Sequence, residues 1–396
     1  MPDFDGRTFF MNQPAPDPSA QLAAYSLNRP WRFLDLVHGA TPQMVRLTAI
    51  AVVVAWVPLA ILSALSGGAA FVSFLTDYAT QSRFLIILPV LILAAPSVDE
   101  RHRIVAHHLE GFVREHQLPN FRASWSSFER LRRSRIAAVL LAGITCAMAI
   151  GLGDYLGPGG AEIVSWWKGE GSFRWFSLAG TWGLFVSYAI LVFFTLLWLW
   201  KQLLWVRFLR SVACLDLRLI AVHPDCLGGL GFLEGSLRGQ LPFSFCIGVA
   251  LSGAVANRVF HHGQALTGFG YVLAVLVAAV LLICVAPYVV FTPILLLMRR
   301  RGMLSYGALA HAAGEQFEKK WLHGVGQEQD LLQTSDFTAT NQLYDIVGII
   351  NGISILPVSQ VDLLALLIVA FIPAIPVVIG AIPLETLVHE AVKLLF

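Results

Sequence analysis

The residues best suited to chemistry lie in the segment LDLRLIAVHPDCLGGLGFL, where His223 and Asp225 flank a proline. A histidine and an aspartate two residues apart could share a proton, bind a cation or hydrogen-bond the end of a neighbouring helix. Three following glycines permit backbone conformations with positive φ: Gly228, Gly229 and Gly231. Because Pro224 also blocks a continued helix, we predict a shaped loop at the membrane face.

The same segment has a structural interpretation. His223 would cap the preceding helix, while the glycines form a tight turn against the bilayer. Two polar residues make an incomplete catalytic set, which favours this interpretation. Four further polar residues could complete a site: Asp77, Arg83, Arg218 and Asp336.

Asp336 belongs to LLQTSDFTATNQLYD, where it follows Thr334 and Ser335. Such a cluster is typical of a helix N-cap, which is the interpretation we favour. If it lay beside the His223 loop, it could complete a polar site at the cytoplasmic mouth of the bundle.

Asp77 and Arg83 flank a short apolar stretch that begins at Phe84. An arginine that snorkels to the membrane interface is the favoured reading. If the helix starts earlier, Arg83 lies in the membrane and needs a partner such as Asp77. None of the predicted span cores contains Asp, Glu, Lys, Arg or His, which argues against a proton-driven pump but leaves a pore possible.

Histidines in HRIVAHH, including His102, faintly resemble the metal-binding boxes of membrane di-iron enzymes. Such sites need several boxes, so we read these histidines as surface residues. The five cysteines are scattered, and no hydrolase or ATPase motif is found. We expect neither a bound metal nor a cofactor.

Composition indicates a membrane protein: mean hydropathy is +0.69 and charged residues make up only 13% of the chain. The net charge of +2 offers no field for nucleic acid. Seven apolar stretches could cross a bilayer. They are Leu47–Leu65, Phe84–Val98, Ile136–Leu152, Ser177–Trp200, Phe243–Ala256, Tyr271–Met298 and Leu363–Leu384.

Two of these spans, Phe84–Val98 and Phe243–Ala256, are too short to cross a bilayer alone, so we expect their helices to continue into the polar residues that flank them. The sixth is long and contains Pro287 and Pro293, which predicts a tilt, a kink or a cytoplasmic extension. The last contains Pro373, Pro376 and Pro383, so it should be bent or broken.

The distribution of basic residues predicts orientation, because 22 of the 27 Lys and Arg residues fall on one side when the loops alternate. Because residues 1–46 contain no apolar stretch, we expect no cleavable signal peptide before the first span. We therefore predict a multi-pass protein of the bacterial inner (cytoplasmic) membrane with a cytoplasmic N-terminus.

The expected fold is all-α: about seven transmembrane helices with a cytoplasmic layer of amphipathic helices. Residues 1–46 form a cytoplasmic segment, and residues 47–396 form one transmembrane domain with helical loops at 99–135, 201–242 and 299–362. Within these loops we predict a hairpin on the membrane surface, broken at Pro119 and Asn120, a helix over Leu203–Leu219, and two helices through Phe317–Trp321 and Leu343–Ile350.

Four segments together resemble a group of uncharacterised bacterial polytopic inner-membrane proteins that carry an HPDxxGGLGFL loop. They are QSRFLIILPVLILA, HPDCLGGLGFL, KKWLHGVGQEQDLLQTSD and the proline-rich last span. The resemblance covers most of the chain and implies fold and location but no activity. Cys226 and Gln333 depart from the group's pattern.

Three classes of function remain open. Kinked spans and a polar loop suggest an oligomeric channel or passive transporter. A helical layer with exposed aromatic and basic residues suggests a scaffold or signalling protein that binds a cytoplasmic partner or anionic lipid. A membrane enzyme acting on lipid through His223 and Asp225 is the third class. The expected partners are the lipid bilayer, further copies of the chain, and anionic lipid at the basic face.

Overall fold

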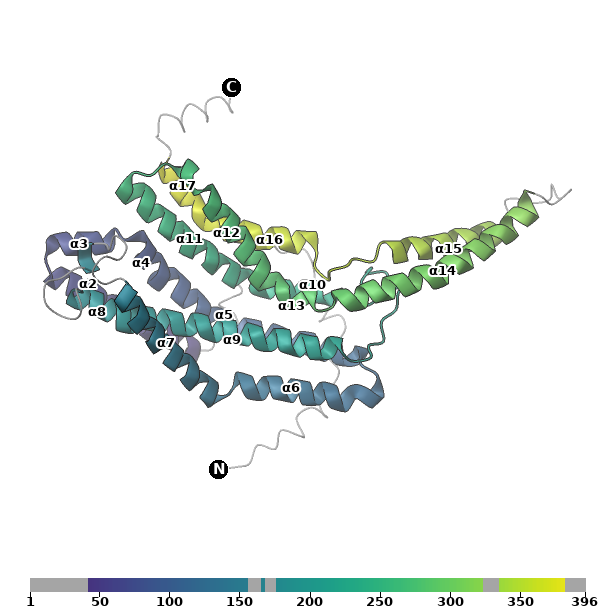
Figure 1. The fold of residues 1–396 in the computed structure, drawn as a ribbon, viewed down its shortest axis with the longest axis horizontal. Helices are drawn as coiled ribbons and strands as arrows, with labels where there is room; N and C mark the ends of the chain where they lie inside the picture. The colour runs from purple at the N-terminus through teal and green to yellow at the C-terminus, as the bar shows by residue number, and fades with distance from the viewer. Residues whose placement is uncertain (1–41, 156–164, 168–175, 323–334, 382–396) are drawn as a thin grey trace, which may run out of the picture.

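The computed structural model describes residues 42–155, 165–167, 176–322 and 335–381, and this part of the chain is an α-helical bundle (Figure 1). Within it, seven helices are long and apolar enough to cross a membrane, which confirms the predicted fold class of a polytopic membrane protein. They are α2 (Pro42–Leu65), the helix Tyr78–Phe112, α7 (Arg135–Tyr155), and the helices Leu178–Ala213, Phe232–His262, Gly270–Val289 and Gln360–Ala381.

Five of these helices contain one turn of different pitch. A π-helical turn joins α4 (Tyr78–Ser82) to α5 (Leu88–Phe112), α8 (Leu178–Trp182) to α9 (Tyr188–Ala213), and α12 (Gly270–Val280) to α13 (Ala286–Val289). A 3₁₀ turn joins α10 (Phe232–Leu237) to α11 (Leu241–His262), and α16 (Gln360–Phe371) to α17 (Ile375–Ala381). The last of these turns contains Pro373, which accounts for the predicted break in the final span.

The two spans that looked short in the sequence are the middle parts of longer helices. The second runs for 35 residues from Tyr78, and the fifth for 31 residues from Phe232. The sixth span ends at Val289, and a new helix, α14 (Thr292–Trp321), begins with Pro293 in its first turn. Because proline has no N–H to donate, it fits this first turn and ends the preceding helix.

The helices outside the bundle core differ in part from the prediction. Residues Ile104–Phe112, expected as a separate surface helix, continue the second span as the last turns of α5. The chain then turns at Val113, and α6 (Leu118–Arg132) starts at Leu118, so Pro119 begins a helix instead of breaking one. From α6 the chain leads directly into α7, as expected.

The predicted helix over Leu203–Leu219 is too long, since α9 ends at Ala213. The segment beyond it becomes extended because Leu217 forms an antiparallel bridge with Val113. The backbone N–H of Arg218 donates to the carbonyl of Phe112 at 2.7 Å. This pairing satisfies backbone groups at the end of α5 that no further helical turn could satisfy.

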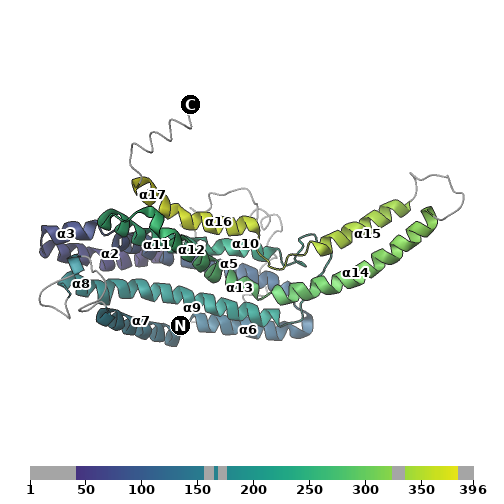
Figure 2. The same ribbon diagram turned by 45° about the horizontal axis from the view of Figure 1, so that its top comes forward.

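A helical hairpin projects from one end of the bundle (Figures 1 and 2). It consists of α14 and α15 (Ser335–Asn351), which are the two amphipathic helices predicted in this loop. Aromatic contacts join them, with the rings of Phe317 and Phe337 4.8 Å apart. The short α3 (Gly68–Leu75) lies at the opposite end of the bundle, beside α2 (Figure 1).

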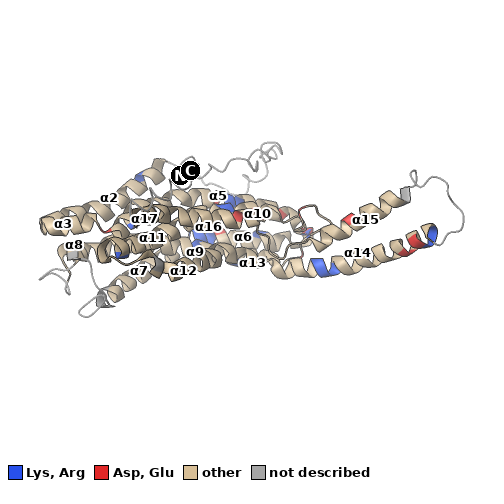
Figure 3. Ribbon diagram, turned by 90° about the horizontal axis from the view of Figure 1, so that it is seen from above, with Lys and Arg blue, Asp and Glu red and all other residues tan. Residues whose placement is uncertain are grey.

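Two polar levels of the bundle lie about one membrane thickness apart. Asp77 and Asp99 lie at the two levels, 22 residues apart along the second helix. At 1.5 Å per residue this is about 33 Å, close to the thickness of the hydrocarbon core. Charged residues are scarce between the two levels (Figure 3). In a bilayer bounded by these two levels, the parts of α5 and α9 beyond Asp99 and Lys201 extend out of the membrane, together with α6 and the hairpin.

Candidate functional site

The HPDCLGGLG segment folds into a turn whose centre is the carboxylate of Asp225. This carboxylate accepts backbone N–H groups from Leu227 at 2.9 Å, Gly229 at 3.0 Å and Gly231 at 2.9 Å. An aspartate that bonds its own following backbone in this way replaces the hydrogen bonds of a regular element. We call residues 223–231 the Asp225 turn.

Burial and hydrogen bonding shift the pKa of Asp225 in opposite directions. Partial burial by itself raises the pKa of this carboxyl, but the three backbone donors and His223 outweigh it, so the pKa lies below its ordinary value. The His223 imidazole Nδ1 lies 2.8 Å from the carboxylate. The carboxylate is therefore held ionised by donors of its own loop.

Two of the three glycines adopt the predicted positive φ, Gly228 at 69° and Gly229 at 100°. A Cβ on Gly229 would lie 2.5 Å from the ring of Phe112 at the end of α5. Gly231 has an ordinary φ of −56°, but a Cβ there would lie 3.1 Å from the Asp225 side chain, so glycine leaves room for this carboxylate to accept the Gly231 N–H. The turn thus needs glycine both for its conformation and for its close approach to α5.

The Asp225 turn also packs inward. Leu227 and Leu230 of the turn are buried in the bundle core, as is Leu233 in the α10 helix that follows. The carbonyl of Cys226 accepts the backbone N–H of Ser354, which lies just after α15. His223 lies ten residues beyond the end of α9, so it does not cap that helix, contrary to the structural interpretation of the sequence.

The other candidate residues do not all converge on this turn. Arg218 lies near it and donates to the backbone carbonyl of Val113 at 3.3 Å. Asp336 lies in the first turn of α15, about 22 Å along that helix from Asn351, its end nearest the turn. Thr334 lies outside the described residues.

Asp77 and Arg83 form a separate site at the other polar level. Asp77 is buried and caps α4, accepting the Thr80 backbone N–H at 3.1 Å and the Thr80 hydroxyl at 2.7 Å. The same carboxylate accepts the Asn257 amide at 2.7 Å and the Trp166 indole N–H at 3.2 Å. Four donors from three parts of the chain therefore surround this carboxylate.

Arg83 lies inside the second helix, five residues after its start at Tyr78, so this helix begins earlier than the predicted span. Its guanidinium donates to the hydroxyl of Tyr188 at 2.7 Å and lies over the same ring. Tyr188, not Asp77, is thus its direct partner. Asp77 and the Asp225 turn lie at opposite ends of the second helix, about 50 Å apart.

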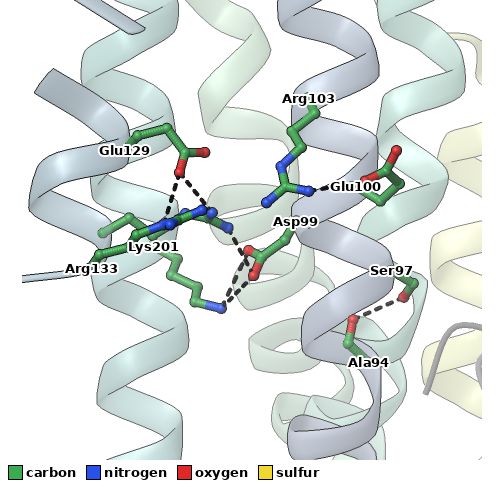
Figure 4. Close-up of polar contacts among 9 residues, drawn as sticks. Ala94, Ser97, Asp99, Glu100, Arg103, Glu129, Arg133 and Lys201 are labelled. Atoms are coloured by element: carbon green, nitrogen blue, oxygen red, sulfur yellow. Dashed lines mark hydrogen bonds and ion pairs between the residues drawn. The ribbon is translucent and has the colours of Figure 1, made fainter. Parts of the chain in front are cut away.

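A third polar group, which sequence reasoning missed, lies where α5, α6 and α9 meet (Figure 4). Asp99 accepts ion pairs from Arg132 at 2.9 Å and from Lys201 at 3.1 Å, while Arg132 also pairs with Glu129 at 2.9 Å. The side chains of Arg132 and Lys201 are only 8% and 17% exposed. We call these four residues the Asp99 network.

The sequence contained a signal for this network. Asp99 directly follows the predicted second span and Lys201 directly follows the predicted fourth span. Charges at the same end of two spans lie at similar depth, so their opposite signs permit an ion pair if the two helices pack together. The second missed pair, Arg238 with the buried Asp362 at 2.6 Å, joins the fifth and seventh spans in the same manner.

His102, read from the sequence as a surface residue, is instead buried. Its ring stacks on Trp205 of α9, with the centroids 4.1 Å apart. One ring nitrogen, Nδ1, has no hydrogen-bond partner. The histidine therefore packs as an aromatic side chain between α5 and α9.

Within the described ranges, no group of three His, Cys, Asp or Glu side chains could hold a metal ion. Comparisons with protein-family models, with curated proteins and with solved structures find no match. The resemblance to bacterial inner-membrane proteins with an HPDxxGGLGFL loop stays a prediction.

Proposed function

We propose that this polytopic membrane protein is an anchored scaffold that binds a partner protein through the α14–α15 hairpin. The observation that carries the proposal is the exposed apolar surface of α14. This helix has 30 residues, about 45 Å in length, and leaves the bundle (Figure 2). Leu304, three residues after the basic residues 299–301 of this helix, is 77% exposed.

The exposed apolar side chains lie within a stretch that has no acidic residue, lysine or arginine, GMLSYGALAHAAG at 302–314. We define the α14 ridge as Met303, Leu304 and Leu309, which are 45%, 77% and 55% exposed. The side of α14 that carries Gly302 is already used, because Gly302 packs closely on Ile350 of α15. Leu304 points to the opposite side of the helix, whereas Leu309, seven residues after Gly302, lies on the Gly302 side but is exposed. Two helices can cover only one side of each other, so these exposed side chains are left without cover.

A third helix with an apolar face is the partner that fits this ridge. It would complete a three-helix bundle, in the way that amphipathic helices dock in apolar grooves. The ridge lacks the charges that usually keep a solvated helix face soluble. The partner is therefore expected to bind by apolar contact more than by charge.

The channel and enzyme alternatives have less geometric support. Large apolar side chains fill the bundle between the two polar levels, including Phe84, Leu88 and Leu184, which are fully buried. A conducting path would have to form between copies of the chain. For an enzyme, the Asp225 carboxylate is already occupied by its own backbone donors.

The basic residues support the orientation in which the hairpin faces the cytoplasm of a bacterial cell. The loops on the hairpin's side of the bundle hold most of the Lys and Arg residues. The partner is accordingly expected to be a cytoplasmic protein or the cytoplasmic part of a membrane protein.

Site-specific photo-crosslinking in cells tests the proposal. A photoreactive residue at position 304 or 309 should give one discrete adduct, whose second chain is identified by peptide sequencing. The matched control is position 315, which is also exposed on α14 but lies in its polar part. No discrete adduct at 304 or 309, or equal adducts at 315, would overturn the scaffold proposal.

The identity of the adduct separates the remaining alternatives. A distinct protein supports the scaffold. A second copy of this chain would overturn it and revive the oligomeric channel, for which ion flux through the purified protein in liposomes is the direct measurement.

A further inference from the structure

A groove runs between α6 and α9, on the far side of the Asp99 network from the apolar part of the bundle. It encloses a cavity of about 290 Å³. Its lining combines apolar side chains, three hydroxyls and one cation: Leu131, Leu204 and Phe208, then Ser124, Ser127 and Ser211, then Arg207. The volume is at the lower end of the range for small-molecule sites, which suits a head group more than a whole lipid.

The depth of the groove follows from the Asp99 network, which lies at the membrane boundary. Leu204 and Arg207 are three and six residues beyond Lys201 on α9, so they lie about 5 and 9 Å outside this level. Leu131 is adjacent to Arg132 on α6. The head groups of a bilayer occupy roughly this layer, so the apolar end of the groove meets the acyl chains and the serines lie farther out.

The basic residues on either side of the groove favour an anionic head group. The facing segments, α6 and residues 201–213 of α9, hold six basic residues and one acidic residue. They are Arg122, Arg130, Arg132, Lys201, Arg207 and Arg210, with Glu129. Glu129 is paired with Arg132, and Asp99 neutralises Lys201, so neither carboxylate offsets Arg207.

From these observations we infer that the α6–α9 groove binds the head group of an anionic phospholipid. The guanidinium of Arg207 pairs with the phosphate, and the hydroxyls of Ser124 and Ser127 donate to its oxygens or to a glycerol head group. The Ser211 hydroxyl already donates to the carbonyl of Phe208 at 2.7 Å, so it can only accept from a head group. The acyl chains leave past Leu131 and Leu204 into the bilayer. The groove thereby fixes the depth of α6 against the membrane.

Native mass spectrometry of the full chain in neutral detergent tests this inference. The protein is titrated with phosphatidylglycerol or phosphatidylcholine, and the singly bound fraction is measured for the parent, Arg207→Gln and Arg210→Gln. Arg210 is the matched control, because it lies one turn further along α9 and does not line the cavity. Equal melting temperatures of the three proteins would show that each is folded.

We expect the parent to prefer phosphatidylglycerol and Arg207→Gln to bind it about tenfold more weakly, as the loss of one charge-assisted contact predicts. Arg210→Gln should bind like the parent. Equal losses in the two variants would mean that the basic surface attracts lipid without a site and would overturn the inference. So would equal binding of the two lipids by the parent. Neither result depends on the hairpin, so the scaffold proposal is tested separately.

Discussion

The Asp225 turn and the Asp99 network both hold a carboxylate among several donors. They differ in how far along the chain those donors lie from the carboxylate. Asp225 finds its three backbone donors within six residues. Asp99 finds its cations 33 and 102 residues away, on two other helices. A local motif can be read from its residues in order, whereas a network across helices exists only after the helices pack.

The difference also predicts how the stability of each region responds when its carboxylate is removed. Removing a carboxylate from the turn frees backbone N–H groups that water can reach in part. Removing Asp99 leaves two poorly exposed cations beside each other, which water cannot easily solvate.

The largest effect is expected for Asp99→Ala. This variant should lose about 3 kcal/mol of stability, since Arg132 and Lys201 remain charged and nearly buried. Thermal unfolding in detergent measures the loss. Glu100→Ala is the control, because its pair with Arg103 is exposed and should contribute less than about 0.5 kcal/mol. Equal effects of the two substitutions would contradict the importance of the network.

Asp225→Ala should cost somewhat less, about 2 kcal/mol, because three backbone donors of the turn lose their acceptor. Asp225→Asn retains one acceptor oxygen and should lose about half as much. The same unfolding assay compares them. An Asp225→Ala protein as stable as the parent would show that water replaces the carboxylate.

Gly229→Ala should cost about 1.5 kcal/mol, because alanine is strained at a φ of 100° and its methyl group would press on Phe112. Combining it with Phe112→Leu should relieve the contact but not the strain. Gly111→Ala provides the comparison, because it lies within α5 and a Cβ there would meet open space. If Gly111→Ala were the more harmful, the role assigned to Gly229 would be wrong.

Acid should weaken the turn selectively. The pKa of Asp225 is lower in the folded protein than in the unfolded chain, so its contribution to stability is complete above about pH 4 and is lost as pH falls through the folded value. The stability difference between the parent and Asp225→Asn should therefore shrink below about pH 4. Melting temperatures of both proteins between pH 3 and pH 7 measure this. A constant difference would contradict the assigned ionisation.

The smallest effect is expected for His223→Ala, at most about 0.5 kcal/mol, because the imidazole is 42% exposed and its pair with Asp225 is screened by water. A large loss of stability would show that His223, and not the backbone, holds the carboxylate in place.

Several features of this protein follow from the sequence alone. The seven spans, the helices around Phe317 and Leu343, and the glycine turn after His223 are local, since each depends on neighbouring residues and on the apolar length that a bilayer requires. The order of the helices therefore needed no tertiary information.

Tertiary structure decided the ends and partners of these elements. α9 stops at Ala213 because Leu217 pairs with Val113, more than a hundred residues earlier. The second helix begins at Tyr78 because Asp77 caps it and is itself held by Asn257 and Trp166. His102 is buried because α9 brings Trp205 against it. Each outcome depends on a contact between distant segments, and no local pattern encodes which of several polar residues a packed helix will meet.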